Sequence, residues 1–447
     1  MNTLPYPLSR PLRRGIMISL ILLFFVICPL LILYTAGYHY SFADRAFTRT
    51  GVLSIDVLPK EATVFVRGVQ IQKELPLRIQ NLSPKTYPVR IEHPGYMSWE
   101  KEMDVRANQT TYIKGIELFK QVESTLVYEQ KTDEEIFPSP LGEYLMGVET
   151  SDQEKNFFLS DMEMRKKIKI LTLPVTTDYS VSWAIGSHWL ALVIPQEETT
   201  VVHLLNATDD RQAVYTIAGK IRHWQWEYST NPVFFVETSQ SLVRLHNGAQ
   251  IVMQKTPDNL SWYANGSTVY ELKDKGTKIE KFTSGKVEQI ISLPTPLTKI
   301  HHVNDERIIG EGTNQSIIVI KKIENNWQET SIFKDQPKLH YNISTKEWNV
   351  FTPWELTTIY EDGRSVLLNR TSEGMQWITA LDDNGVILVQ TQNKLQAFNP
   401  GYYLTHTLFE GELASAGSAP PVVDKKNRII YFFANIDGRV GLYEREF

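Results

Sequence analysis

The stretch WAIGSHWLALV runs from Trp183 to Val193 and joins two apolar segments through a polar turn around Gly186. The pattern recurs as WEYSTNPVFFV at 226–236 and as WYANGSTVY at 262–270. Weaker copies begin at His302, Leu381 and Val423. Short apolar segments rich in β-branched and aromatic residues, separated by a tight polar turn, predict antiparallel hairpins.

The copies recur with a period of about 40 residues. Their turns centre on residues 142, 186, 231, 266, 305, 345, 384 and 425. This period, with four strands in each, is typical of a β-propeller. We predict an all-β propeller of eight blades over residues 120–447, or of seven because the unit near 345 is weakly marked. The last strands, 428–434 and 439–444, would form an incomplete blade that residues 122–129 complete, which would latch the ring.

The composition limits the classes of protein to which the chain can belong. Its 447 residues suit two or three domains, and 42% hydrophobic with 22% charged residues is typical of folded chains. A net charge of −5 excludes a general electrostatic attraction to nucleic acid. One cysteine excludes an intrachain disulfide and a cysteine-ligated zinc site.

Residues 16–34, IMISLILLFFVICPLLILY, carry no charge. As a helix they would span about 29 Å, close to the ~30 Å hydrocarbon core of a bilayer. Arg10, Arg13 and Arg14 precede the run, whereas Arg45 beyond it is offset by Asp44. The positive-inside rule therefore predicts a cytoplasmic tail at 1–14, a transmembrane helix at 15–38 in contact with the lipid bilayer, and extracytoplasmic domains after it, so that the chain is a single-pass cell-membrane protein.

Two other interpretations of this segment stay open. Thr35-Ala36-Gly37 has the small-x-small form of a signal-peptide cleavage site, although the apolar run exceeds the usual 7–15 residues. A core helix of a soluble domain would rarely be apolar on every face. Cys28 lies mid-span and follows Ile27 rather than a small residue, so we interpret it as an inert buried thiol and not as a lipidation site.

Residues 50–119 alternate apolar and polar side chains over several short segments. Leu53, Ile55 and Val57 share one face, and Tyr87, Val89 and Ile91 share another. Turn residues at 59–62, 81–84 and 93–96 separate the segments. This alternation, without a helical period, predicts a small β-sandwich.

The same stretch resembles a PEGA domain, a bacterial β-module named for a Pro-Glu-Gly-Ala turn. The matching positions are Gly51, Pro59, Ala62, Gly68, Pro76, Leu82, Pro84, Tyr87, Gly95, Tyr96 and Trp99. The naming turn here, Pro59-Lys60-Glu61-Ala62, lacks its glycine, and Lys85 stands where the family usually has glycine. The resemblance implies an extracytoplasmic, non-catalytic module with no defined ligand. Within the repeats, the turn from Trp262 to Gly266 also looks like the Trp-Ser-x-Asp-Gly turn of TolB-type propellers, in a degenerate form.

Motifs of known chemistry are missing or incomplete. The nearest string to a nucleophile elbow, Leu413 to Gly417, lacks the first glycine. His301 and His302 are adjacent, so on a strand they point to opposite faces and cannot both coordinate one metal ion. Asp382-Asp383-Asn384-Gly385 is interpreted as a hairpin turn, and Asp209-Asp210 and 133–135 as solvated turns. We therefore predict no catalytic, cofactor-binding or metal-ligating residues and no cofactor.

The aromatic residues have two interpretations. Trp224, Trp226, Trp262, Trp348, Trp354 and Trp377 recur in the repeats. They could form a face that stacks on sugars or peptides, or they could fill the space between blades; we favour packing. Tyr96 and Trp99 offer the same alternatives, and packing is favoured there too.

Three functions remain. The favoured one is a single-pass cell-envelope protein that displays a non-catalytic binding or scaffolding propeller outside the membrane, with its axial face binding an envelope protein or a cell-wall polysaccharide. The second is an extracytoplasmic hydrolase or lyase of polysaccharides, with acids at the propeller funnel. The third is a sensor or assembly subunit that signals through residues 1–14, a tail too short to fold.

Overall fold

The computed structural model describes residues 10–35, 38–41, 46–131, 134–162, 165–209, 211–246, 248–255, 261–413 and 420–447. The chain divides into two compact units, Met1–Gln121 and Val122–Phe447. The division falls two residues after the boundary predicted between 119 and 120. Each unit is described separately below.

The first unit begins with helix α1 (Arg10–Thr35), which contains Pro29. Residues Pro11–Thr35 are long and apolar enough to cross a membrane, and none of this stretch is buried against the rest of the described chain. The helix therefore does not pack into a core of the described chain. The helix begins at Arg10, before the start of the predicted span 15–38, and ends at Thr35, before the end of that span. Tyr38 already belongs to strand β1 (Tyr38–Ser41), which pairs with β2 (Ala46–Arg49). Cys28 is a partly exposed free cysteine, and residues 36 and 37 lie outside the described residues.

Residues 51–117 form two sheets. One contains β6 (Leu77–Leu82), β3 (Gly51–Leu58) and β9 (Thr110–Glu117), and the other β5 (Val69–Gln70), β4 (Thr63–Val66), β7 (Lys85–Glu92) and β8 (Trp99–Val105). The pairing of β3 with β9 is parallel. The six side chains predicted to point inward from β3 and β7 are all buried, since alternate residues of a strand share one face.

Trp99 and Tyr96 do not form a sugar-stacking pair. Trp99 is 2% exposed within the sandwich core, and the Tyr96 ring lies edge-on to His93. The packing interpretation is confirmed for Trp99, because a buried indole presents no face to a ligand.

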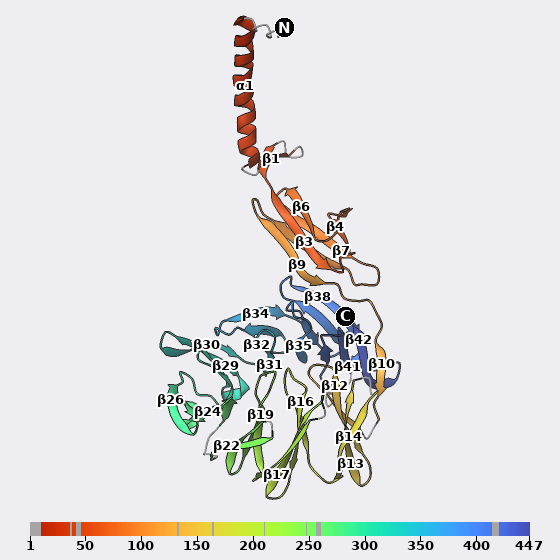
Figure 1. Ribbon diagram of the computed structural model, residues 1–447, viewed down its shortest axis with the longest axis vertical. Helices are drawn as coiled ribbons and strands as arrows, with labels where there is room; N and C mark the ends of the chain where they lie inside the picture. The colour runs from red at the N-terminus through yellow and green to blue at the C-terminus, as the bar shows by residue number, and fades with distance from the viewer. Residues whose placement is uncertain are drawn as a thin grey trace, which may run out of the picture. The chain divides into compact units, whose positions relative to one another are not determined.

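The described residues of the second unit form eight sheets, here called blades 1 to 8 (Figure 1). Blade 1 contains β11 (Glu134–Pro138), β12 (Tyr144–Thr150), β13 (Glu154–Asp161) and β14 (Lys167–Pro174). Blade 2 contains β15 (Ser180–Trp183), β16 (Trp189–Pro195), β17 (Thr199–Asn206) and β18 (Gln212–Ala218). Blade 3 contains β19 (Ile221–Trp226), β20 (Phe234–Thr238), β21 (Ser241–His246) and β22 (Ala249–Lys255). Blade 4 contains β23 (Trp262–Asn265), β24 (Thr268–Lys273), β25 (Lys278–Thr283) and β26 (Lys286–Ser292).

Blade 5 contains β27 (Lys299–Val303), β28 (Arg307–Glu311), β29 (Ile317–Ile323) and β30 (Asn326–Phe333). Blade 6 contains β31 (Lys338–Asn342), β32 (Glu347–Phe351), β33 (Glu355–Ile359) and β34 (Ser365–Arg370). Blade 7 contains β35 (Trp377–Ala380), β36 (Ile387–Gln390), β37 (Lys394–Asn399) and β38 (Leu404–Glu410). Blade 8 contains β39 (Glu412–Leu413), β40 (Val422–Asp424), β41 (Ile429–Ile436), β42 (Arg439–Glu446) and, from the start of the unit, β10 (Thr125–Glu129). Eight is the larger of the two predicted blade numbers.

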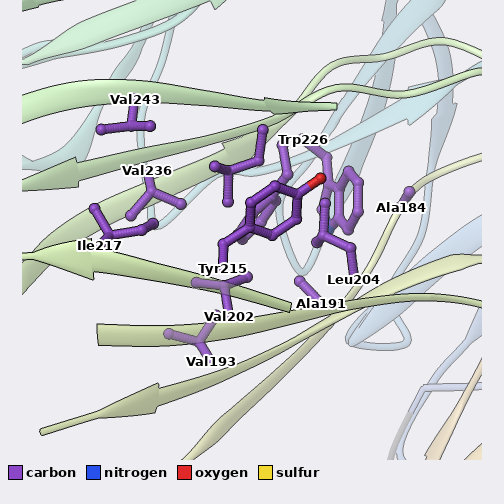
Figure 2. Packing of buried hydrophobic residues seen from close by; sticks show 12 residues of the cluster. Ala184, Ala191, Val193, Val202, Leu204, Tyr215, Ile217, Trp226, Val236 and Val243 are labelled. Atoms are coloured by element: carbon purple, nitrogen blue, oxygen red, sulfur yellow. The ribbon is translucent and has the colours of Figure 1, made fainter. Parts of the chain in front are cut away.

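Apolar clusters between neighbouring blades close the ring. Figure 2 shows one of them, in which Val193 and Val202 of blade 2 pack with Val236 and Val243 of blade 3. Equivalent clusters join blades 1 to 2, 3 to 4, 4 to 5, 5 to 6 and 6 to 7. Blades 7 and 8 meet through ring contacts such as Phe409 with Phe432, and blade 8 packs on blade 1 in a further cluster. Each sheet thereby buries both faces, which a single blade cannot do alone.

The predicted latch is confirmed. Strand β10 pairs antiparallel with β42, the last strand of the chain, and lies beside it in Figure 1. The guanidinium of Arg445 donates a hydrogen bond to the carbonyl of Val122. The two ends of the unit therefore share one sheet, which removes an open edge.

Two sequence interpretations concerned acidic turns. Asp382 is confirmed in a hairpin turn, where its Oδ1 accepts hydrogen bonds from the backbone N–H groups of Asn384 and Val386. The solvated turn predicted at 133–135 is wrong for Glu134, which lies in β11, is 4% exposed and accepts a hydrogen bond from the Tyr128 hydroxyl. The latch strand covers this carboxylate, which is why it is buried. Asp133, Asp210 and the string after Leu413 lie outside the described residues.

Candidate functional site

Seven of the eight turns found in the sequence join the first and second strands of a blade, and the eighth, near 425, joins β40 to β41 in blade 8. Because the strands of a blade alternate in direction, these turns all lie at one end of the ring axis. There, a cavity of about 270 Å³ is lined by residues of blades 1, 2, 6, 7 and 8. We call this cavity the axial pocket. It lies on the axial face where the sequence analysis expected binding.

The turn from Ile343 to Lys346 in blade 6, here called the crossing turn, reaches across the ring. A Cβ atom on Gly186 of blade 2 would lie 2.3 Å from Cδ1 of Ile343, so the two residues are in close contact. Gly186 also has a φ of +78°, which favours glycine. Both the space and the backbone conformation at this position therefore require the absence of a side chain.

Tyr228 of blade 3 makes a second contact across the axis. Its ring centroid lies 4.7 Å from that of Tyr341 and 5.3 Å from that of Trp348, both in blade 6. Burial raises the pKa of Tyr228 to about 12, so the hydroxyl stays neutral. Tyr228 of blade 3 therefore packs on two aromatic rings of blade 6 that flank the crossing turn.

Arg307 anchors the crossing turn from blade 5. The residue is 1% exposed. Its Nη1 donates hydrogen bonds to the carbonyls of Ile359 and Tyr360, and its Nη2 lies 3.2 Å from the carbonyl oxygen of Lys346 at the end of the turn. A buried guanidinium that donates to three backbone carbonyls fixes their positions, since removing it would take away a charge-assisted hydrogen bond from each of them.

Lys425 of blade 8 joins the crossing turn to blade 7. Its Nζ lies 2.9 Å from Oδ1 of Asp383 and 3.4 Å from both the carbonyl oxygen of Asp382 and Oγ of Ser344. The three donors of this ammonium group are therefore engaged. Lys426, which also lines the pocket, is exposed.

The acidic side chains that line the pocket have structural partners. Asp424 accepts hydrogen bonds from the backbone N–H and the side-chain amide of Asn427, at 2.9 and 2.8 Å. Oε2 of Glu143 lies 3.5 Å from Nε2 of His188. On the opposite wall, burial and then the nearby charge of Lys425 lower the pKa of His340 to about 4, so its imidazole is neutral at pH 7.

The histidines and tryptophans take the places that the strand geometry predicts. His301 approaches Glu311, whereas Nδ1 of His302 lies 3.1 Å from the Tyr263 hydroxyl, so the two rings face different neighbours. Within the described ranges, no group of three metal-ligating side chains is found. Trp226, Trp262 and Trp348 are buried between blades, which confirms packing for them, whereas Trp354 is exposed.

The sequence analysis missed Gly186, Tyr228, Arg307 and Ile343 as the residues that build the pocket. The one available signal was Arg307, a charge in the apolar half of the repeat copy that begins at His302. The other three could not be found, because their contacts join blades that are far apart in sequence.

Replacing Gly186 with alanine tests the contact across the ring. We expect Gly186→Ala to lower the free energy of unfolding by about 1–2 kcal/mol more than Gly248→Ala. Gly248 is a matched control, since its φ is +79° and no atom lies within 4 Å of an added Cβ. Urea denaturation followed by tryptophan fluorescence provides the comparison. In an Ile343→Ala background, Gly186→Ala should lower the free energy of unfolding by no more than Gly248→Ala does. Equal losses for the two glycine variants in the wild-type background would contradict the contact between Gly186 and Ile343.

The sequence of the first unit was compared with known families. Residues 50–118 match the PEGA domain family. This stretch is a PEGA domain. Its two sheets and its buried alternating residues agree with the sandwich predicted for residues 50–119. The match covers only this part of the chain, and no curated protein matches the sequence.

Solved structures resemble the chain at low identity. Hsv2 from Kluyveromyces lactis is 9% identical, with a TM-score of 0.37 over 65% of this chain and 99% of that one. The uncharacterized protein lmo1340 from Listeria monocytogenes is 10% identical, with a TM-score of 0.42 over 66% and 100%. BamB from Moraxella catarrhalis is 11% identical, with a TM-score of 0.34 over 64% and 98%. These scores are too low to support an inference about function.

Proposed function

We propose that the chain is a single-pass cell-envelope protein that displays a non-catalytic binding propeller outside the membrane. Helix α1 would act as the membrane anchor, with the PEGA domain between it and the propeller. The axial pocket would be the binding site. Its partner would be an envelope protein or a cell-wall polysaccharide.

The observation that carries this proposal is the construction of the axial pocket. Residues from five blades line one cavity, and residues of blades 2, 5 and 8 contact the crossing turn that forms part of its wall. Concave sites that are largely pre-formed and mostly apolar are typical of binding pockets. Binding is favoured over hydrolysis, because Asp424 and Glu143, the acids at the cavity, are engaged in contacts within the fold.

Cysteine labelling on whole cells tests the orientation. Cys28 is the one cysteine of the chain, so a Cys28→Ser background allows a single cysteine to be placed at Thr216, an exposed position of β18. We expect Thr216→Cys to react with a membrane-impermeant maleimide on intact cells. Ser9→Cys, in the predicted cytoplasmic tail, should react only after permeabilisation, as expected if positive residues stay inside. The opposite pattern would overturn the orientation.

The size of the mature protein separates an anchor from a signal peptide. If helix α1 is an anchor, the protein in the membrane fraction keeps its N-terminal residues, and intact-mass analysis gives the full-length value. Cleavage near Thr35-Ala36-Gly37 would instead give a shorter protein that is released from membranes by a carbonate wash. That result would contradict the proposal that helix α1 is a membrane anchor, but it would not contradict the proposal that the propeller binds a partner.

A further inference from the structure

The outer edge of blade 2 differs from the outer edges of the other blades. Exposed edges of sheets are usually protected from pairing by charged residues, proline or β-bulges. Seven of the eight outermost strands contain a charged residue, from Lys167 in β14 to Glu410 in β38, and each pairs with its neighbour through a register shift. The outermost strand of blade 2, β18 with the sequence QAVYTIA, has no charge, no proline and no register shift. Blade 2 therefore lacks the features that usually prevent pairing at an edge.

The hydrogen-bonding groups on the free side of β18 follow from its ladder with β17. The backbone N–H of Asn206 donates to the carbonyl of Arg211 at one end of the ladder, and the N–H of Gly219 donates to the carbonyl of Glu198 at the other. The ladder between these bonds is regular, and bonding alternates along an antiparallel strand, so the odd-numbered residues of β18 bond to β17. The N–H and C=O groups that point away from the blade belong to Gln212, Val214, Thr216 and Ala218.

The strand is held firmly on its other side. Tyr215 and Ile217 are buried against blade 3, and the hydroxyl of Tyr215 accepts a hydrogen bond from the backbone N–H of Gly248. The four residues with outward backbone groups are exposed, and the side chain of Val214 is 55% exposed. An edge that is already ordered pays little conformational entropy when a further strand is added.

The sequence of β18 is complementary to itself. Two copies of the strand can pair antiparallel about a twofold axis at Tyr215, which places Val214 of one copy opposite Thr216 of the other and Gln212 opposite Ala218. In this register the outward groups of each strand face those of the other. No like charges meet, because the strand has none. A twofold interface of this kind uses the same surface on both copies.

The charges that flank β18 suit the same arrangement. Asp209 and Arg211 lie at its start, and Glu198 and Lys220 lie beside its end; all four are exposed. Antiparallel pairing brings the start of one strand to the end of the other. Arg211 then lies opposite Gly219 of the second copy, in one cross-strand row with Glu198, and Gly219 has no side chain to separate them. Each end of the pair thus brings an acid and a base of one copy to a base and an acid of the other.

We propose that β18 is a homodimer interface, in which the edge strands of two copies of this chain pair antiparallel and join two blades into one continuous sheet. The inference goes beyond the proposed function, since it concerns a different surface from the axial pocket. A pair of seven-residue strands buries less than the ~1,200 Å² of standard stable interfaces. We therefore expect a reversible dimer with a dissociation constant of about 1–100 μM.

Two double variants at the same positions test the pairing. In Val214→Lys/Thr216→Lys, the register places each lysine opposite a lysine of the other copy, so we expect the dimer to be at least tenfold weaker. In Val214→Lys/Thr216→Glu, each lysine lies opposite a glutamate, so the dimer should stay within about threefold of wild type. Sedimentation velocity of the full-length protein in detergent micelles, at increasing protein concentration, measures the dissociation constants.

Two further variants complete the test. Ile290→Lys adds a charge at a 57% exposed residue of β26 and should leave the dimer unchanged. If the double lysine variant fails to fold, Thr216→Pro takes its place. Proline there removes an outward N–H and leaves the ladder with β17 intact, as proline does at sheet edges, and the dimer should again weaken at least tenfold.

Three results would overturn the proposal. Wild type that remains monomeric at every concentration shows that β18 does not pair with itself. A dimer that survives the double lysine change forms elsewhere on the chain, for example through helix α1. Equal weakening by the lysine–lysine and lysine–glutamate variants contradicts the antiparallel register centred on Tyr215.

Discussion

Replacing Arg307 with methionine is expected to lower the free energy of unfolding by about 3–5 kcal/mol. The buried guanidinium holds the carbonyls of Ile359, Tyr360 and Lys346 in blade 6. Methionine fills a similar volume but donates no hydrogen bond. The substitution therefore removes the guanidinium's hydrogen bonds to three carbonyls in a buried place, and that is the main source of the cost; the Tyr360 carbonyl still accepts the N–H of Gly363.

Urea denaturation followed by tryptophan fluorescence measures this loss, since every tryptophan except Trp99 lies in the propeller unit. Arg364→Met is the matched control. Arg364 is exposed and pairs with the partly exposed Asp362, so its loss should change stability by no more than about 0.5 kcal/mol. If both variants unfold at the same urea concentration, Arg307 does not anchor blade 6.

Replacing Gly441 with valine is expected to open the ring at its latch. A Cβ atom at this position would lie 2.3 Å from the carbonyl oxygen of Tyr128 and 2.8 Å from Cδ1 of Leu126, both in β10. Because the clash falls on β10 and not on the other neighbour of β42, it prevents the closing pair specifically. We expect a loss of about 3–4 kcal/mol and rapid protease cleavage between residues 122 and 133.

Gly374→Val serves as its control, because no atom lies within 4 Å of a Cβ built on Gly374. It should resist protease as wild type does. The opening can also be separated from general unfolding. Thr216, in blade 2, should stay protected from cleavage in Gly441→Val at low protease concentration. Intact β10 in Gly441→Val would show that the latch does not hold the ring closed.

Interpretations that rest on local pattern agree with the structure. Period-two alternation placed Leu53, Ile55 and Val57 inside the sandwich, since strand geometry alone fixes which residues share a face. The turns near 142 to 384 fall between the first and second strands of their blades, and the turn near 425 falls between β40 and β41, because polar turn residues interrupt apolar strands locally. The prediction of a solvated turn was wrong for Glu134, because the burial of Glu134 depends on Tyr128, which belongs to strand β10.

The pocket depends on contacts that no local pattern records. Gly186 and Ile343 meet across the ring although about 160 residues separate them. Arg307 reaches three carbonyls of the next blade, and nothing in the sequence around it indicates those acceptors. Side chains that meet at a ring axis are brought together by closure, and closure is a property of all blades at once.

The order of apolar and polar residues by itself determined the apolar helix, the sandwich, the repeated four-stranded sheets and the strand that closes the ring. It could do so because a few neighbouring residues settle which side chains of a strand are buried. Only the tertiary structure decided which turns meet at the axis and which glycine admits Ile343. Those outcomes follow from distances between blades, and the distances exist only once the ring has formed.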